Sequence, residues 1–345
     1  MAPIKSSLAR TVGRLLGVQK DTDLSLRGDV QSNRKITSSV QASGGTEIVT
    51  ATNKWHVFLG SSEQNFSVTR GGTCEVLVVA GGGGGGYFYG AGGGAGGVVH
   101  APGFPVEKDV TYKVSAGDGG TGAPNTGFGN NGSASYLKPS PSPAAPSATN
   151  LYAMGGGGGG YSGDGDTAFP TPYKNSTGSG GGSVSPSSPN DTLPNFSTVT
   201  QHPTGTKYFN RGASGQPSDN GGGGGGAGAA AGINQDGGIT DPASPGGAGR
   251  PFSNFPAPVI APAIPAPARS TWSTAVGPTG LFAGGGTGYN APANIPRTPG
   301  GGGGWDDPQS GIHHGVDYTG GGGSGPNPGG GTGGKGIVIV YYPTE

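Results

Sequence analysis

Uninterrupted glycine runs are the feature that most constrains how this chain can fold. The longest runs cover residues 81–86, 155–160, 221–226 and 300–304, and shorter runs lie between them. Without Cβ atoms, such runs can form left-handed extended helices that pack against one another on all sides, with three residues per turn and a rise of about 3.1 Å. Their backbone N–H and C=O groups point sideways and can pair between helices. We therefore expect packed polyglycine II helices, with long loops clustered at the ends of the bundle.

The glycine runs have two other interpretations. A flexible linker is one, because glycine-rich chain is normally coil. It is disfavoured because strand-like runs near both ends of the domain would then enclose roughly 200 residues of coil. A fixed-period solenoid is the other. It is excluded because the long runs start 74, 66 and 79 residues apart, whereas solenoid repeats return every 20 to 50 residues or so.

Short strand-like runs frame the glycine. They cover residues 46–50, 55–59, 66–69, 76–79, 97–100, 110–116, 133–137 and, at the C-terminus, 336–342. In the second run, apolar residues alternate with His56 and Phe58, which predicts a sheet with one covered face. The last run must pair with the early ones, because a buried strand has to satisfy its backbone hydrogen bonds. The sequence thus predicts a mostly β fold with little helix: a small antiparallel β-sandwich frame closed by its first and last strands.

The pattern divides the chain into three parts. Residues 1–27 are interpreted as an N-terminal docking segment, 28–45 as a linker, and 46–345 as a glycine-rich β/polyglycine domain with a loop-rich excursion over 139–334. Within the excursion, residues 256–267 alternate proline with small apolar residues, which predicts a stiff polyproline II strut.

The first part is predicted to contain a short helix with one apolar side. That side consists of Ile4, Leu8, Val12, Leu15 and Leu16. Its apolar stretches are too short for a secretory signal, and its basic composition also resembles an organelle transit peptide. Docking onto a partner protein is preferred over transit. A surface helix that folds onto its own domain is an equal alternative.

Charge and cysteine content exclude several classes of protein. The chain has 19 Lys and Arg against 19 Asp and Glu, and only 11% of its residues are charged. It therefore lacks the basic surface that nucleic-acid binding requires. The single cysteine, Cys74, excludes an internal disulfide framework. No run approaches the roughly 18 apolar residues of a membrane span, so we expect no membrane insertion.

Motifs for catalysis or metal binding are weak. Residues 329–335 match a phosphate-binding loop, but Gly336 stands where Ser or Thr should ligate magnesium, and a strand follows the loop instead of preceding it. The pair His313 and His314 has aspartates nearby, yet adjacent residues of an extended chain face opposite ways, so surface decoration is preferred over a metal site. Cys74 adjoins an apolar run and is expected to be a buried thiol. We expect no enzymatic activity, no cofactor and no metal.

Aromatic residues that follow the glycine runs are stronger candidates. They are Tyr87, Phe88, Tyr89, Tyr161, Tyr289 and Trp305. Because each lies at or near the end of a run, these rings should lie at the ends of the bundle. There they could stack on sugars or pack on a partner protein. Alternatively, they cap the glycine core against water, an interpretation that the sequence slightly favours. Together with His313 and His314 they form the predicted receptor or partner surface.

Several blocks of sequence, in their order, resemble the glycine-rich domain of tailed-phage virion proteins. They are Glu-Val-Leu-Val-Val-Ala-Gly₆ (75–86), Gly-Ala-Gly-Gly-Gly-Ala-Gly-Gly-Val-Val (90–99), Tyr-Lys-Val-Ser-Ala-Gly (112–117), Gly-Asn-Asn-Gly-Ser-Ala-Ser (129–135) and Gly-Gly-Lys-Gly-Ile-Val-Ile-Val (333–340). Residues 1–27 also resemble the N-terminal segment of structural proteins from marine cyanobacterial phages. The similar parts cover about 1–137 and 320–342. The proline-rich region 139–299 departs from the pattern.

The resemblance implies a non-enzymatic protein of the virion, on the tail or capsid surface. By this likeness it is a tail fibre or tip adhesin, in which stacked polyglycine helices present loops to the host. The expected partners are other virion proteins, bound through the N-terminal segment, and a host saccharide or outer-membrane protein. A homo-oligomer is expected, and a trimer is usual among fibres. The alternatives are a capsid-decorating or assembly protein and a self-assembling glycine-rich filament protein.

Overall fold

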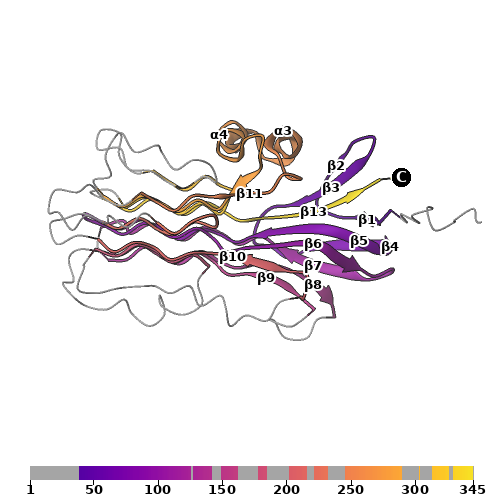
Figure 1. Cartoon of the computed structure of the whole chain (residues 1–345), viewed down its shortest axis with the longest axis horizontal. Helices are drawn as coiled ribbons and strands as arrows, with labels where there is room; N and C mark the ends of the chain where they lie inside the picture. Colours follow the sequence, from indigo (N-terminus) through magenta and orange to yellow (C-terminus); the bar gives the residue numbers. More distant parts are fainter. Residues whose placement is uncertain are drawn as a thin grey trace, which may run out of the picture. The chain divides into compact units, whose positions relative to one another are not determined.

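Antiparallel strands build two sheets that share a core, and glycine segments run on from the ends of the strands (Figure 1). The structure is a computed structural model that describes residues 39–125, 127–141, 149–161, 178–184, 202–215, 221–231, 245–289, 303, 313–325 and 329–344. The prediction of a mostly β, antiparallel frame with little helix is confirmed. The predicted N-terminal helix and its apolar residues lie outside the described residues.

The smaller sheet has five strands in the order β1-β4-β7-β8-β9. Their bounds are β1 Gln41–Ser43, β4 Gln64–Arg70, β7 Thr111–Ser115, β8 Ser135–Ser140 and β9 Leu151–Ala153. Strand β1 lies in the segment that the sequence assigned to a linker. It pairs with β4 and buries Val40 and Ala42, so the folded domain begins before residue 46.

The larger sheet has six strands in the order β10-β6-β5-β13-β3-β2. Their bounds are β10 Thr206–Tyr208, β6 Val98–Val106, β5 Gly72–Val79, β13 Ile337–Pro343, β3 Asn53–Phe58 and β2 Thr46–Val49. The last strand pairs with early strands, as predicted, but it enters the middle of the sheet. Ile339 of β13 lies opposite Val57 of β3 on one side and Leu77 of β5 on the other. The first strand of the frame belongs to the other sheet.

Both faces of the six-stranded sheet are covered, so the prediction of one covered face is wrong. On one face, Phe58, Val76 and Val338 pack against Phe66 and other residues of the five-stranded sheet. On the other face, Trp55, Val57 and Ile339 pack with residues of a helical segment. That segment comprises α3 Ala257–Ile260, the 3-10 helix η4 Ala261–Ala263 and α4 Ala266–Val276, flanked by the two-stranded sheet of β11 Arg250–Pro251 and β12 Leu281–Phe282. The second hydrophobic cluster covers the face of β3 that carries Trp55 and Val57, and the first covers the face that carries Phe58.

The helical segment replaces the predicted polyproline II strut, which is therefore wrong. Each helix has a proline in its first turn, at the first or second position. Proline is tolerated there because a first-turn N–H has no partner within the helix. The closely spaced prolines that indicated a strut therefore lie in the first turns of three successive helices. The fully buried Trp272 of α4 anchors this segment, and its Nε1 donates to Tyr318 O over 3.0 Å.

The glycine segments are joined end to end with the strands. Strand β5 leads into residues 80–86, β6 follows 91–97, β7 leads into 116–123, β8 follows 129–134 and β13 follows 329–336. The sheets consequently fix where each glycine segment starts and which segments are neighbours.

Residues 80–86 show a three-residue period in their hydrogen bonds. Every third N–H faces the same neighbouring segment, as a helix with three residues per turn requires. The N–H groups of Ala80, Gly83 and Gly86 donate to the carbonyls of Gly97, Gly94 and Ala91, over 3.0, 2.8 and 2.9 Å respectively. Those of Gly81 and Gly84 donate to Ser133 and Asn130, over 3.0 and 2.9 Å. Those of Gly82 and Gly85 donate to Gly334 and Gly331, over 2.9 and 2.8 Å. The carbonyls of the same helix accept hydrogen bonds from three further segments. The donors are the N–H groups of Gly156 and Gly159 in the first segment, of Gly120 and Ala123 in the second, and of Gly323 in the third. This helix therefore has six neighbours within the described residues.

Residues 91–97 repeat this arrangement. Their N–H groups bond in turn to segments 154–160, 222–225 and 320–323, again with a period of three residues. Their carbonyls accept from 80–86, from Ser179 and Gly182, and from Gly286. Two adjacent helices with six neighbours each define a lattice of polyglycine II helices, as the sequence predicts.

The lattice leaves no room for side chains between helices. A Cβ atom on Gly82 would overlap the carbonyl oxygen of Gly321, and one on Gly85 would overlap that of Ser324. Two of the alanines in these helices lie beside a side-chain core: Ala80 belongs to the cluster between the sheets, and Ala95 to the cluster under the helices. The long runs therefore contain only glycine because the backbones of neighbouring helices approach too closely to admit a Cβ atom.

We predict that Gly83→Ala destabilises the protein strongly, because its Cβ would overlap Gly157 O. The free energy of unfolding should fall by about 3 kcal/mol or more, the upper range for forced overpacking. Urea denaturation measures this change. Gly103→Ala in β6 is the matched control, because a Cβ there meets no atom within 4 Å. It should change stability by less than about 0.5 kcal/mol. Equal effects of the two substitutions would contradict the lattice.

Candidate functional site

Five of the six predicted aromatic residues converge at a turn between glycine helices 80–86 and 91–97. Tyr87, Phe88 and Tyr89 link residues 80–86 to 90–97, and the chain reverses there, with Gly86 N–H bonded to Ala91 O over 2.9 Å. Phe88 and Tyr89 have φ values of 48° and 52°. Both residues therefore lie in the left-handed region, which bulky side chains seldom adopt.

Five rings from three parts of the chain form a continuous series, called here the aromatic cluster. Its members are Tyr161, Tyr87, Phe88, Tyr89 and Tyr289. Their successive ring centroids are 6.2, 5.9, 4.4 and 4.7 Å apart. The three contributing segments are also joined by backbone bonds, from Tyr289 N–H to Gly90 O and from Ala91 N–H to Gly160 O, each 3.0 Å. The lattice thus positions all five rings.

Phe88 is the most exposed member of the aromatic cluster. Its side chain is 40% exposed, whereas the four tyrosines are half-buried. Trp305, the sixth ring of the predicted surface, lies outside the described residues. An exposed apolar ring beside phenol groups can offer both packing and hydrogen bonding to a ligand.

The two histidines of the predicted surface are built into glycine segments. His313 O accepts from Ser324 Oγ at 2.8 Å, and His314 Nδ1 accepts from the Thr332 N–H at 2.9 Å. Asp317, one of the nearby aspartates, pairs with Lys335 over 3.6 Å. No group of three or more potential metal ligands occurs among the residues that the structure describes.

The segment that matches a phosphate-binding loop uses its amides in the lattice. Gly330, Gly331 and Gly333 donate to Ala123, Ser324 and Gly120 over 2.8–2.9 Å. A phosphate loop needs such amides for its ligand. Cys74 is buried as predicted, its Sγ lies 3.4 Å from Phe104 O, and burial raises the pKa of the thiol far above its usual range.

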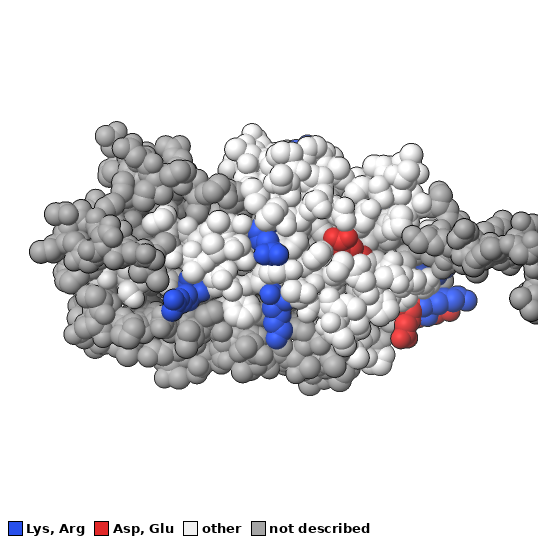
Figure 2. Space-filling model, in the orientation of Figure 1, with Lys and Arg blue, Asp and Glu red and all other residues white. Residues whose placement is uncertain are grey.

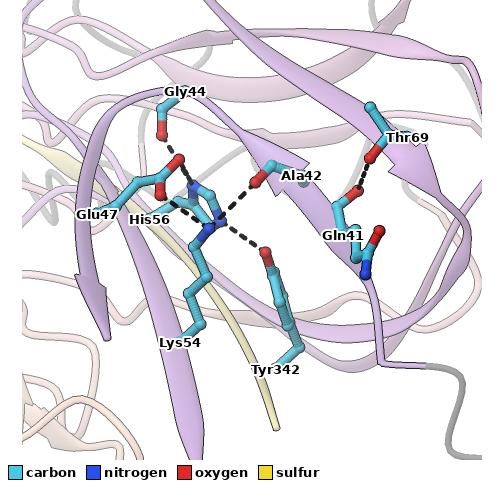
Figure 3. Close-up of polar contacts among 8 residues, drawn as sticks. All are labelled: Gln41, Ala42, Gly44, Glu47, Lys54, His56, Thr69 and Tyr342. Atoms are coloured by element: carbon cyan, nitrogen blue, oxygen red, sulfur yellow. Dashed lines mark hydrogen bonds and ion pairs between the residues drawn. The ribbon is translucent and has the colours of Figure 1, made fainter. Parts of the chain in front are cut away.

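A buried histidine at the junction of β1, β2, β3 and β13 was not singled out by sequence analysis (Figure 3). His56 Nδ1 lies 2.8 Å from Gly44 O and donates to it, while Nε2 lies 2.8 Å from the Tyr342 hydroxyl. Lys54 pairs with Glu47 at 2.8 Å and donates to Ala42 O at 3.3 Å. No local pattern could reveal the pair of His56 and Tyr342, which are 286 residues apart. These bonds fasten the turn between β1 and β2 to the last strand.

Burial holds the pKa of His56 below its ordinary value, because an imidazolium there would be desolvated. The adjacent Lys54 lowers this pKa further, whereas Glu47 and the bond to Gly44 raise it. A neutral imidazole can donate a hydrogen bond through Nδ1 and accept one from the Tyr342 hydroxyl at Nε2. The contacts of His56 and Lys54 therefore hold neighbouring strands together.

In a comparison with known protein families, residues 59–343 match the model of a glycine-rich domain. The chain belongs to this glycine-rich domain family. The match spans β4 to β13 and nearly all of the described lattice. The comparison with curated proteins gave no match. Among the described residues, none of the helices of this glycine-rich domain is both long and apolar enough to cross a membrane.

We predict that the stability of the domain falls as the pH drops from about 7 to 5. The unfolded chain binds a proton at His56 below its ordinary pKa of 6.5, whereas the folded chain binds it only at lower pH. This one group can remove up to about 1.4 kcal/mol per pH unit in that interval. Urea denaturation at several pH values measures the slope. His56→Gln should give a flatter profile, and an unchanged slope would show that His56 does not contribute.

Proposed function

We propose that this chain is a non-enzymatic structural protein of a tailed-phage virion, a tail fibre or tip adhesin that contacts the host surface. The observation that carries the proposal is the aromatic cluster, an exposed ring and four tyrosines at the end of glycine helices. Exposed aromatic residues are typical of surfaces that bind partners. The likeness of the sequence blocks to phage glycine-rich domains supports the virion assignment.

The lattice suits such a role because the hydrogen bonds between its helices are made by backbone groups, not by the side chains of the turns that connect the helices. Backbone groups bond from helix to helix, so residues beyond the ends of the helices can change without altering the packing. Residues 80–86, 155–160 and 284–288 are each followed directly by a ring of the aromatic cluster. A rigid body that gathers loop residues at one place is what an adhesin needs to present a contact surface.

The attachment of this protein to the particle is assigned, as part of the proposal, to residues 1–27, whose apolar positions would dock on another virion protein. A homo-oligomer, of which a trimer is one form, also belongs to the proposal.

The proposal is tested by locating the protein on phage particles and by competition for host cells. We predict that antibodies raised against the purified chain label the tail in electron micrographs, and that the purified chain reduces phage adsorption in proportion to its concentration. Labelling of the head together with normal adsorption would contradict the proposal and favour a capsid-decorating protein. Filaments formed by the purified chain, with no label on particles, would favour a self-assembling glycine protein.

A further inference from the structure

We infer that the turn formed by Tyr87, Phe88 and Tyr89, with Tyr289 beside it, binds a neutral saccharide. The inference deepens the proposed function, on which it rests, by assigning a class of ligand to the contact surface. It depends on the backbone of the turn, the exposure of Phe88 and the angles between the rings.

The backbone of the turn indicates that its side chains are required. Left-handed conformations cost an L-residue about 1–2 kcal/mol, whereas glycine adopts them freely. Phe88 and Tyr89 occupy two such positions in succession, at φ values of 48° and 52°, between Gly86 and Gly90. In a chain with 80 glycines, glycine at both positions would make the same turn without strain. Strain of this kind gathers at functional sites.

The exposure of Phe88 argues against a role limited to capping the glycine core. A cap stabilises by removing apolar surface from water. Phe88 remains 40% exposed, and only one other large hydrophobic residue of the described part, Val49, is classed as exposed. Tyr87, Tyr89 and Tyr289 are half-buried, and the first two are in ring contact with Phe88. The strained Phe88 therefore adds surface for a ligand.

The rings form a corner that suits a sugar. Tyr87 and Phe88 are nearly parallel, at 27°, while Tyr89 stands at 69° to Phe88 and Tyr289 at 77° to Tyr89. A pyranose has an apolar face of C–H groups, which can lie on one ring, and a rim of hydroxyls. Tyrosine hydroxyls both donate and accept hydrogen bonds, as sugar hydroxyls do.

Two observations favour a neutral saccharide over a protein. The members of the aromatic cluster are Tyr and Phe residues, which carry no charge at neutral pH. On the face of the molecule drawn in Figure 2, the charged side chains of the described residues are scattered. A stable protein interface buries about 800 Å² on each partner, far more than one exposed ring with half-buried neighbours offers.

The test is affinity electrophoresis of the full chain in gels that contain glucan, mannan or galactan. We expect at least one of these polysaccharides to retard the protein. Phe88→Gly should weaken binding at least tenfold and leave the melting temperature equal or higher, because glycine relieves the left-handed strain. Phe88→Asn, which also tolerates this conformation, repeats the test if the glycine variant folds poorly. Val49→Ala, which truncates the other exposed large hydrophobic residue, is the matched control and should change binding less than threefold.

Each contrary result overturns the inference. Failure of all three polysaccharides to retard the protein overturns the assignment of a neutral saccharide to this turn. Unchanged binding by Phe88→Gly places the site elsewhere. A lower melting temperature in both Phe88→Gly and Phe88→Asn, with a proportional loss of binding, would mean that the ring is a cap. If the polysaccharides fail but the purified chain still blocks adsorption, the proposed function stands with a protein receptor. If a polysaccharide binds but the tail carries no label, the proposed function fails and the site stands.

Discussion

Lateral hydrogen bonding between glycine helices is the interaction on which the rest of this structure depends. Ordering glycine costs more backbone entropy than ordering any other residue, so the lattice forms only if nearly every peptide group finds a partner. Residues 80–86 and 91–97 meet this condition, because each bonds in turn to neighbours on all sides. The absent Cβ atoms are what allow carbonyl oxygens to approach so closely.

The sandwich and the lattice support each other. Side-chain packing between Phe58, Phe66 and Val338 holds the two sheets together. Strands such as β5, β6 and β13 then deliver glycine segments already side by side. The sheets thereby reduce the entropy lost when the helices associate. In return, the lattice gives an ordered structure to glycine segments that lie between the early strands and β13. Strand β13 pairs with β3 and β5, so residues far apart in the sequence must meet in the six-stranded sheet.

The sequence predicts the parts of this fold in which a residue type leaves few alternatives. Pure glycine runs indicate the lattice, and the apolar run at residues 76–79 indicates a buried strand. The strands β9, β10, β11 and β12 escape prediction because two or three residues carry no periodicity. The helices α3 and α4 are not predicted, because prolines at this spacing are compatible both with a polyproline II strut and with the first turns of successive helices. For the candidate site, the position of the rings after glycine runs was predictable, but the contact of Tyr89 with Tyr289 depends on the lattice.

Amide hydrogen exchange followed by mass spectrometry tests the lattice most directly, because it reports on the N–H groups that are claimed to hold it. The account predicts that peptides covering residues 80–86 and 91–97 exchange as slowly as the central strand β5, since their amides are bonded and buried. Exchange of those glycine amides at the rate of unstructured chain, with β5 still protected, would contradict it.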